Sequence, residues 1–146
     1  MKRGLVIVLL FAALVALQCG TEGQQDTTEI KKVISEFHRA FDARDYAGMR
    51  DLCTDDMYWY TLDGRALARD KMAEFFAPMT SRWTSIKTTL KEMEIFRIKN
   101  LAWARYKSEI TIQVGDNNST MQNLHTIILK QQDGAWKIWQ HHMSTK

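Results

Sequence analysis

Cysteine, proline and long runs of one charge are scarce in this sequence. Its 146 residues include two cysteines and one proline. Two cysteines are too few for the disulfide framework of a small secreted domain, and no repeat or low-complexity segment is present. The fold therefore has to rest on an ordinary hydrophobic core.

Positive charge is not concentrated anywhere, since no run of Lys or Arg exceeds two residues. The chain carries 20 basic and 17 acidic side chains, a formal net charge of +3. Domains that bind nucleic acid gather basic residues into a patch or stripe. We therefore expect no nucleic-acid partner.

Apolar and aromatic residues, in contrast, are plentiful. Hydrophobic residues make up 45% of the chain, which has five Trp, six Phe and four Tyr. A chain of this length forms one domain and buries roughly two-thirds of the surface of its unfolded state. The composition predicts a single folded domain with a substantial core.

The N-terminus has the pattern of a secretory signal. Lys2 and Arg3 precede an unbroken apolar run at residues 5–17. A membrane-spanning helix needs about 20 apolar residues, so this run is too short for one. We assign residues 1–18 to a signal peptide and expect export, with an uncleaved anchor as the alternative.

Cys19 stands directly after the apolar run and resembles the lipobox cysteine of bacterial lipoproteins, which is lipid-modified and becomes the new N-terminus. Gln18 departs from the pattern, in which Gly, Ala or Ser is usual. We expect lipidation at Cys19, a polar tether over residues 19–27 and a domain over residues 28–146. The expected location is the bacterial cell envelope, with the periplasm as the alternative. If Cys19 is lipidated, we expect Cys53 to be a small buried thiol. If Cys19 is free, a disulfide between Cys19 and Cys53 is the alternative.

The first half of the domain predicts helices. Apolar residues recur at helical spacing in one stripe, formed by Ile30, Val33, Ile34, Phe37 and Phe41. A short helix is expected over residues 46–53, and a third over 70–77, where Pro78 should end it. Between them, residues 57–62 alternate as in a strand and end at the Asp-Gly turn at 63–64.

The second half predicts strands. They are expected over residues 86–99, 102–114, 124–131 and 135–143. The inside–outside alternation of the first changes phase between 95 and 96, which indicates a bulge, and a turn is expected at 115–119. The second strand alternates with period two, as in an antiparallel sheet with one wet face. Helices followed by a meander of strands predict the α+β class.

The last hairpin predicts where the histidines lie. Asp-Gly at 133–134 favours a two-residue type I′ turn. With that register kept along the hairpin, His125 lies opposite His142, and both share the inner face with Gln140. His141 then points outward. A three-residue loop would instead pair His125 with His141.

The order of these elements resembles a known family. Leu-Cys-Thr-Asp-Asp at 52–56 precedes the first strand, and Asp-Gly-x-Trp-x-Ile at 133–138 leads to His142-x-Ser144. This arrangement resembles the SnoaL-like branch of the nuclear transport factor 2-like superfamily, which includes ketosteroid isomerases. The resemblance covers residues 28–144. It implies three N-terminal helices packed on a strongly curved antiparallel sheet (a cystatin-like α+β roll), a conical cavity and a homodimer.

The resemblance also allows a test of the isomerase reaction. Ketosteroid isomerases carry a Tyr donor on the first helix and an Asp base on the first strand. Aligned through Asp55 and Asp56, these positions fall on Phe37 and Thr61. Phe donates no hydrogen bond, and Thr is no base near neutral pH. Isomerase chemistry of that kind is therefore not expected.

The inner face of the expected sheet and the first helix define a pocket. We expect it to be lined by Phe37, Trp59, Thr61, Tyr106, Ser108, His125, Gln140 and His142. His142 and His125 are the candidate acid–base residues, since imidazole titrates near physiological pH; the alternative is that they only stabilise the sheet end. No metal is expected, because His141 and His142 point to opposite faces. No cofactor is expected either.

Three functions remain open at this point. The first is an exported module, tethered to a membrane only by its lipid, that binds a small, largely apolar molecule. The second is a lyase, isomerase or hydrolase that uses His142. The third is a homo-oligomeric interaction domain with a vestigial pocket, suggested by Trp103 and Trp139 on the outer face of the sheet.

Overall fold

The computed structural model describes residues 22–145, with side chains from Thr27 onward. The predicted signal peptide (1–18) and Cys19 lie outside these residues. Within this range no helix is long and apolar enough to cross a membrane. The elements in order are α2 (Glu22–Asp42), α3 (Tyr46–Asp51), β1 (Cys53–Tyr60), β2 (Ala66–Ala68), the 3-10 helix η1 (Arg69–Lys71), α4 (Met72–Thr80), β3 (Ser85–Ile98), β4 (Leu101–Val114), β5 (Asn117–Gln132) and β6 (Ala135–Thr145).

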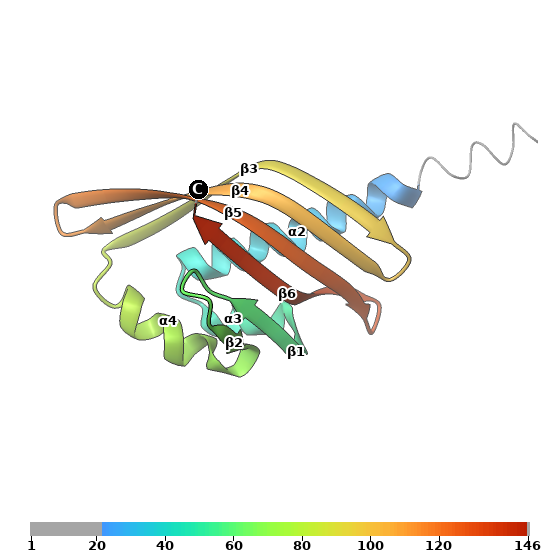
Figure 1. The fold of residues 1–146 in the computed structure, drawn as a ribbon, viewed down its shortest axis with the longest axis horizontal. Coiled ribbons are helices and arrows are strands. Elements are labelled where there is room, and N and C mark those ends of the chain that lie inside the picture. The colour runs from blue at the N-terminus through green and yellow to red at the C-terminus, as the bar shows by residue number, and fades with distance from the viewer. Residues whose placement is uncertain (1–21, 146) are drawn as a thin grey trace, which may run out of the picture.

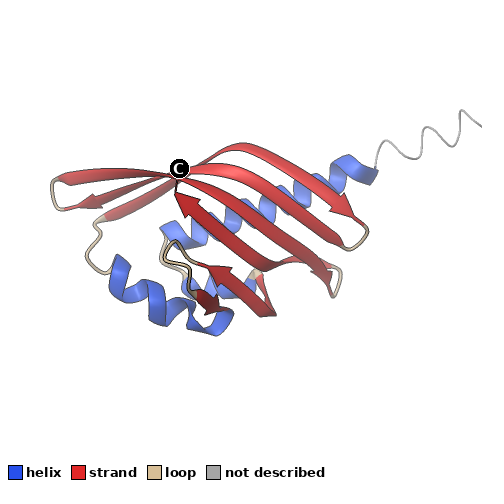
Figure 2. Cartoon of the chain, in the orientation of Figure 1, coloured by secondary structure: helices blue, strands red, loops and turns tan. Residues whose placement is uncertain are grey.

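The strands form one six-stranded curved sheet in the order β2-β1-β6-β5-β4-β3. All neighbours are antiparallel except β1 and β6, which run parallel. Figure 1 shows α2 running along one face of this sheet, with α3 and α4 beside β1. Three helices on a curved, mostly antiparallel sheet confirm the predicted α+β architecture, and Figure 2 shows that helices and strands occupy separate layers.

The apolar stripe of α2 supplies one side of the core. Ile30, Ile34 and Phe37 are completely buried, and burial of each is worth roughly 1.5–3 kcal/mol. The carboxylate of Asp42 ties the end of the helix to β3, since it accepts bonds from the backbone N–H of Thr88 (2.8 Å) and from its hydroxyl (2.6 Å). The helix begins at Glu22, so it takes in part of the segment expected to be a tether.

Two expected boundaries are wrong. Pro78 does not end the third helix, because α4 continues through it to Thr80. The proline removes one backbone donor close to the helix end, where Ser81 caps the last turn through its backbone N–H to Ala77 O (3.0 Å) and its hydroxyl to Pro78 O (2.9 Å). The first strand begins at Cys53 rather than at residue 57, because α3 already stops at Asp51.

The long strands confirm the predicted alternation. In β4 the residues Ala104, Tyr106, Ser108, Ile110 and Ile112 are all buried, and the residues between them are exposed or half-buried. The bulge expected in β3 is present, but it lies between Lys91 and Glu94, where Glu92 adopts a φ of 52°. The turn after β4 is shorter than expected, so β5 already begins at Asn117.

The last hairpin follows the predicted register only near its turn. Asp133 and Gly134 have φ angles of 52° and 78°, as a type I′ turn requires, and Gln132 pairs with Ala135. The register then shifts between Leu129 and Ile128, which lie opposite Ile138 and Gln140. Trp139 is therefore the extra residue of a β-bulge.

This bulge reverses the predicted orientation of the histidines. His125 lies opposite Met143 rather than His142. His141 is completely buried on the inner face, whereas His142 is exposed. One inserted residue moves every following side chain to the other face. The expectation that His142 faces inward and His141 outward is therefore wrong.

Candidate ligand cavity

A cavity of about 410 Å³ lies between α2, α4 and the inner face of the sheet. Its walls are mainly aromatic and aliphatic side chains. The aromatic ones are Phe41, Trp59, Phe75, Phe76 and Trp83. Cavities of this size and composition are typical binding sites for small molecules.

The aromatic walls pack against one another and so hold the cavity open in one shape. The ring of Phe76 lies 5.4 Å from Phe41, edge to face, and 4.9 Å from Trp59. Such ring pairs add about 0.5–1.5 kcal/mol each beyond the area they bury. The cavity is thus largely preformed.

His38 and His125 form part of a polar end in this apolar cavity. His38 comes from α2, and its Nε2 shares a hydrogen bond of 2.7 Å with the hydroxyl of Tyr106. Burial lowers the pKa of His38 to about 4 and that of His125 to about 3, with the nearby His38 adding to the second effect. Both imidazoles are therefore neutral near pH 7. Burial also raises the pKa of Tyr106, which keeps its phenol protonated.

A continuous hydrogen-bonded chain runs behind this polar end. The hydroxyl of Ser108 lies 2.7 Å from Nε2 of His125, and Nδ1 of His125 lies 2.8 Å from Nε2 of His141. The ring of His141 stacks on Trp59 at 4.3 Å. Burial lowers the pKa of His141 as well, so the chain consists of neutral groups, each donating to or accepting from the next.

Asn123 is the third polar residue at this end of the cavity, beside His38 and His125. Its side chain lines the cavity and is 1% exposed, yet neither its amide nitrogen nor its amide oxygen has a hydrogen-bond partner among residues 27–145. A buried polar group without a partner costs about 1–3 kcal/mol. A ligand that satisfied this amide would recover that cost, so Asn123 is well suited to hold a polar group of a bound molecule.

The loop at residues 61–65 lies at the edge of the cavity. The hydroxyl of Thr61 donates to Asp63 (2.5 Å), and the guanidinium of Arg65 pairs with the same carboxylate (2.6 Å). The hydrogen bond from Arg65 and, to a smaller extent, the one from Thr61 hold the pKa of Asp63 well below its usual range. Arg65 also lies 4.9 Å above the ring of Phe75. The charges here neutralise each other, which leaves the cavity without a net charge at this edge.

The structure divides the residues expected to line the pocket into three groups. Trp59, Thr61 and His125 line the cavity. Tyr106 and Ser108 are buried directly behind its polar end, where they bond to its histidines. The others, Phe37 in the core, Gln140 half-buried and His142 exposed, are not part of its lining.

Three polar residues near the cavity were not foreseen. His38 follows Ile34 by four residues and so belongs to the buried stripe of α2. The helical spacing in the sequence could therefore have predicted its position. Asn123 pairs with Ser108 across β4 and β5, which a two-residue turn after Val114 would have predicted. Only the bulge at Trp139 brings in His141. Among the described side chains, no three metal-ligating groups converge on one point.

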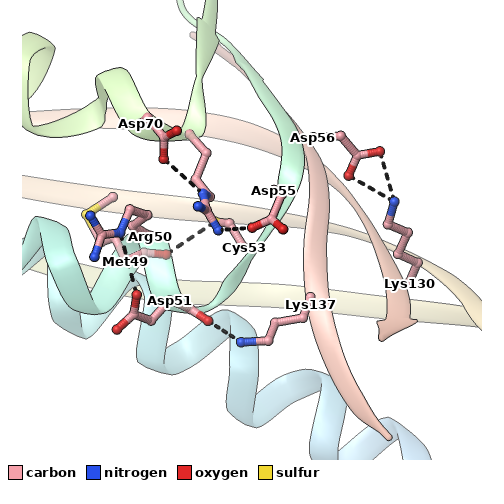
Figure 3. Close-up of polar contacts among 10 residues, drawn as sticks. Met49, Arg50, Asp51, Cys53, Asp55, Asp56, Asp70, Lys130 and Lys137 are labelled. Atoms are coloured by element: carbon pink, nitrogen blue, oxygen red, sulfur yellow. Dashed lines mark hydrogen bonds and ion pairs between the residues drawn. The ribbon is translucent and has the colours of Figure 1, made fainter. Parts of the chain in front are cut away.

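A second polar cluster lies outside the cavity, where α3 meets β1 and β6 (Figure 3). Arg69 bridges the carboxylates of Asp55 (2.5 Å) and Asp70 (3.2 Å), and the ammonium of Lys137 donates to the backbone oxygen of Asp51. Cys53 is free and buried here, and burial raises the pKa of its thiol to about 12. The cluster joins neighbouring elements, and its thiol is unreactive at neutral pH.

Comparison with known proteins agrees with this architecture. The sequence profile of the SnoaL-like domain family matches residues 30–146. No curated protein matches the chain significantly.

Several solved structures share the fold. A candidate scytalone dehydratase from Novosphingobium aromaticivorans superposes with a TM-score of 0.78 at 12% identity, over 85% of this chain and 86% of its own. A candidate dehydratase of the NTF2-like family from Streptomyces avermitilis gives 0.76 at 14%, over 84% and 98%. The CaMKII hub homology domain from Chlamydamonas reinhardtii gives 0.72 at 18%, over 83% and 98%. Identities this low establish a common fold and nothing more.

Proposed function

The chain belongs to the SnoaL-like domain family, and we propose that it binds a small, largely apolar molecule in the cavity beneath its curved sheet. The observation that carries this proposal is the combination of aromatic walls with one buried polar end. Asn123 supplies an unpaired amide there, beside the neutral imidazoles of His38 and His125. Apolar walls provide binding energy, and a few polar groups fix the orientation of the ligand.

The polar end favours an uncharged ligand. His38 and His125 are neutral near pH 7, and the ion pair of Asp63 and Arg65 leaves no net charge at the cavity edge. A carboxylate or ammonium group would lose its hydration without finding a counter-charge. A hydroxyl or carbonyl group, in contrast, would match both the amide of Asn123 and the imidazoles.

Thermal-shift screening of neutral aromatic and alicyclic alcohols and ketones tests this proposal. A compound present at a hundred times its Kd should stabilise the chain by about 2.7 kcal/mol. Met121→Trp should fill the cavity and abolish the stabilisation. Leu124→Trp, on the exposed face of the same strand, is the matched control and should preserve it. Equal effects of the two variants, or no hit in the library, would contradict the proposal.

A second candidate function is acid–base elimination of water from a hydroxylated ligand. Two neutral imidazoles line the same cavity, and one is bonded to a protonated phenol, so a base and a proton donor lie side by side. Two proteins of the same fold are described as candidate dehydratases. Loss of turnover in His38→Gln and His125→Gln with retained binding would support this function, and turnover unchanged in both would exclude it.

Export and lipid anchoring complete the proposal. We base them on the apolar run at residues 5–17 and on Cys19 after it. A chain expressed with radioactive palmitate should incorporate label, and Cys19→Ser should not. Unlabelled wild-type chain recovered from the periplasm would leave export in place and remove the anchor.

We also propose that the outer face of the sheet forms a homodimer. Phe96 and Trp103 stack at 4.8 Å there and are 40% and 41% exposed. Exposed aromatic patches of this kind are frequent at protein interfaces. Sedimentation should show a dimer that Trp103→Glu dissociates, whereas a monomeric wild-type chain would refute this assembly.

A further inference from the structure

We propose that the cavity selects ligands with a cis-amide edge, meaning the N–H and C=O groups that a lactam ring holds side by side, and that Asn123 recognises this edge. This specificity rests on the ligand binding proposed above and narrows the ligand to one chemical class. Asn123 is suited to the role because its side-chain amide presents a donor and an acceptor together in the cavity wall.

Both polar atoms of the Asn123 side chain are unpaired. The residue is 1% exposed, and neither Nδ2 nor Oδ1 has a hydrogen-bond partner within residues 27–145. Trp59 is the other lining residue in this range with a buried polar atom that lacks a partner, but its indole N–H is a donor only. Of the described lining residues, Asn123 alone therefore leaves a buried donor and a buried acceptor open together.

The polar neighbours of Asn123 are bonded to other groups. Ser108 lies opposite Asn123 on β4, but its Oγ shares a hydrogen bond of 2.7 Å with Nε2 of His125. The second ring nitrogen of His125, Nδ1, is bonded to Nε2 of His141 at 2.8 Å. The inner face of the sheet thus pairs these groups with one another, which leaves the amide of Asn123 for a molecule in the cavity.

A cis-amide edge satisfies both atoms of the Asn123 amide at once. In a lactam the N–H and C=O groups lie on the same side, so the N–H donates to Oδ1 while the C=O accepts from Nδ2. An alcohol or a ketone offers a single oxygen atom, which satisfies one of the two atoms and leaves the other buried without a partner, at a cost in affinity. An open-chain secondary amide is trans, so its two groups point in opposite directions.

The rest of the cavity fits the remainder of such a ligand. Its volume of about 410 Å³ admits two fused rings, and the rings of Trp59 and Phe41, packed at 4.9 and 5.4 Å from Phe76, provide flat apolar walls. A lactam is uncharged, as the absence of a counter-charge requires. A carboxylic acid has a similar edge only when it is protonated, and near pH 7 it is ionised. The expected ligand is therefore an aromatic or alicyclic lactam.

Three bicyclic compounds of similar shape test this specificity. The compound 2-quinolone has the cis-amide edge, coumarin has a ring oxygen in place of the N–H, and N-methyl-2-quinolone has the N–H blocked. Isothermal titration calorimetry with the full 146-residue chain should give a Kd for 2-quinolone that is about tenfold or more below the Kd of either analogue. Equal Kd values for 2-quinolone and coumarin would overturn the proposal, and this comparison needs no variant.

Asn123→Leu tests which residue makes the distinction. Leu is similar to Asn in size but has no polar group, so this variant should bind the three compounds with Kd values within about threefold of one another. Gln122→Leu, which removes an exposed amide from the neighbouring position of β5, is the matched control and should keep the tenfold preference. A preference that persisted in Asn123→Leu would overturn the role of Asn123.

The outcomes separate this specificity from the proposed function. Thermal shifts by neutral alcohols and ketones, without a preference for 2-quinolone over coumarin, would overturn the specificity and leave ligand binding intact. A preference for 2-quinolone that Asn123→Leu abolishes and Gln122→Leu retains would support both. No thermal shift with any neutral compound, these three included, would contradict both.

Discussion

Both faces of β4, β5 and β6 carry polar residues, but in different surroundings. On the inner face Ser108, His125 and His141 are buried, neutral and bonded to one another. On the outer face Arg105 and Lys107 pair with Glu94 and Glu92 on the next strand in water-exposed ion pairs. Burial makes an unpaired polar group costly, whereas solvent makes a paired charge nearly free.

This contrast indicates which face of the sheet carries a functional site. Polar groups on the inner face cost stability unless each finds a partner, so their presence needs a reason beyond the fold. The outer ion pairs need none, because solvent-exposed charges keep their hydration. The following substitutions test the contrast, from the largest expected effect to the smallest.

Phe37→Ala should have the largest effect. Phe37 is completely buried and contacts the rings of Trp59 and His141 at 5.6 and 5.7 Å. Its truncation should lower the free energy of unfolding by about 3–5 kcal/mol. Tyr58→Ala, on the outer face, should cost less than about 1 kcal/mol in the same urea titration. Similar losses for both would mean that the two faces do not differ in packing.

Lowering the pH should have the second-largest effect on stability. The pKa of His38 is about 4 in the fold against an ordinary 6.5, so the unfolded chain binds its proton first as pH falls. Stability is therefore complete above pH 6.5 and declines as pH falls toward 4, by on the order of 3 kcal/mol for this group. Urea titrations from pH 7.5 to 4 should show the decline, and His38→Gln should reduce it. His142→Gln, on the exposed side, should leave the decline as it is.

Ser108→Ala should have an intermediate effect on stability. It removes the hydroxyl partner of Nε2 of His125 and leaves a buried nitrogen unpaired. The expected loss is about 1–3 kcal/mol. Thr111→Ala, which breaks an exposed hydroxyl pair with Thr120 at 3.3 Å, should cost less than about 0.5 kcal/mol. Thermal melts of both variants would measure the difference, and a neutral Ser108→Ala would show that water replaces the hydroxyl.

Arg105→Ala should have the smallest effect. Its guanidinium pairs with Glu94 at 2.6 Å, but both side chains are more than half exposed. The free energy of unfolding should change by roughly 0–1 kcal/mol, and the change should shrink further in 0.5 M salt. A loss above 2 kcal/mol that persisted in salt would show that the outer charges support the fold as strongly as the inner network does.

Local patterns predicted much of this fold. The stripe of α2, the alternation of β4 and the Asp-Gly turn before β6 all follow from spacing and turn chemistry, and the structure confirms them. The cavity was predicted less well. Trp59, Thr61 and His125 line it as expected, but Phe37 and Gln140 do not, and His38 and Asn123 were missed.

The sequence alone thus predicts the α+β class, the buried face of the regular strands and the buried side of the first helix. These features depend only on the backbone period and on residues close by in the chain. Which histidine enters the interior depends instead on how β6 pairs with strands that are distant in the sequence. The bulge at Trp139 exposes His142 and buries His141, and it lies in a strand that pairs with β5 on one side and with β1 on the other. Register between distant strands is a long-range property, so only the assembled sheet could place His141 beside His125.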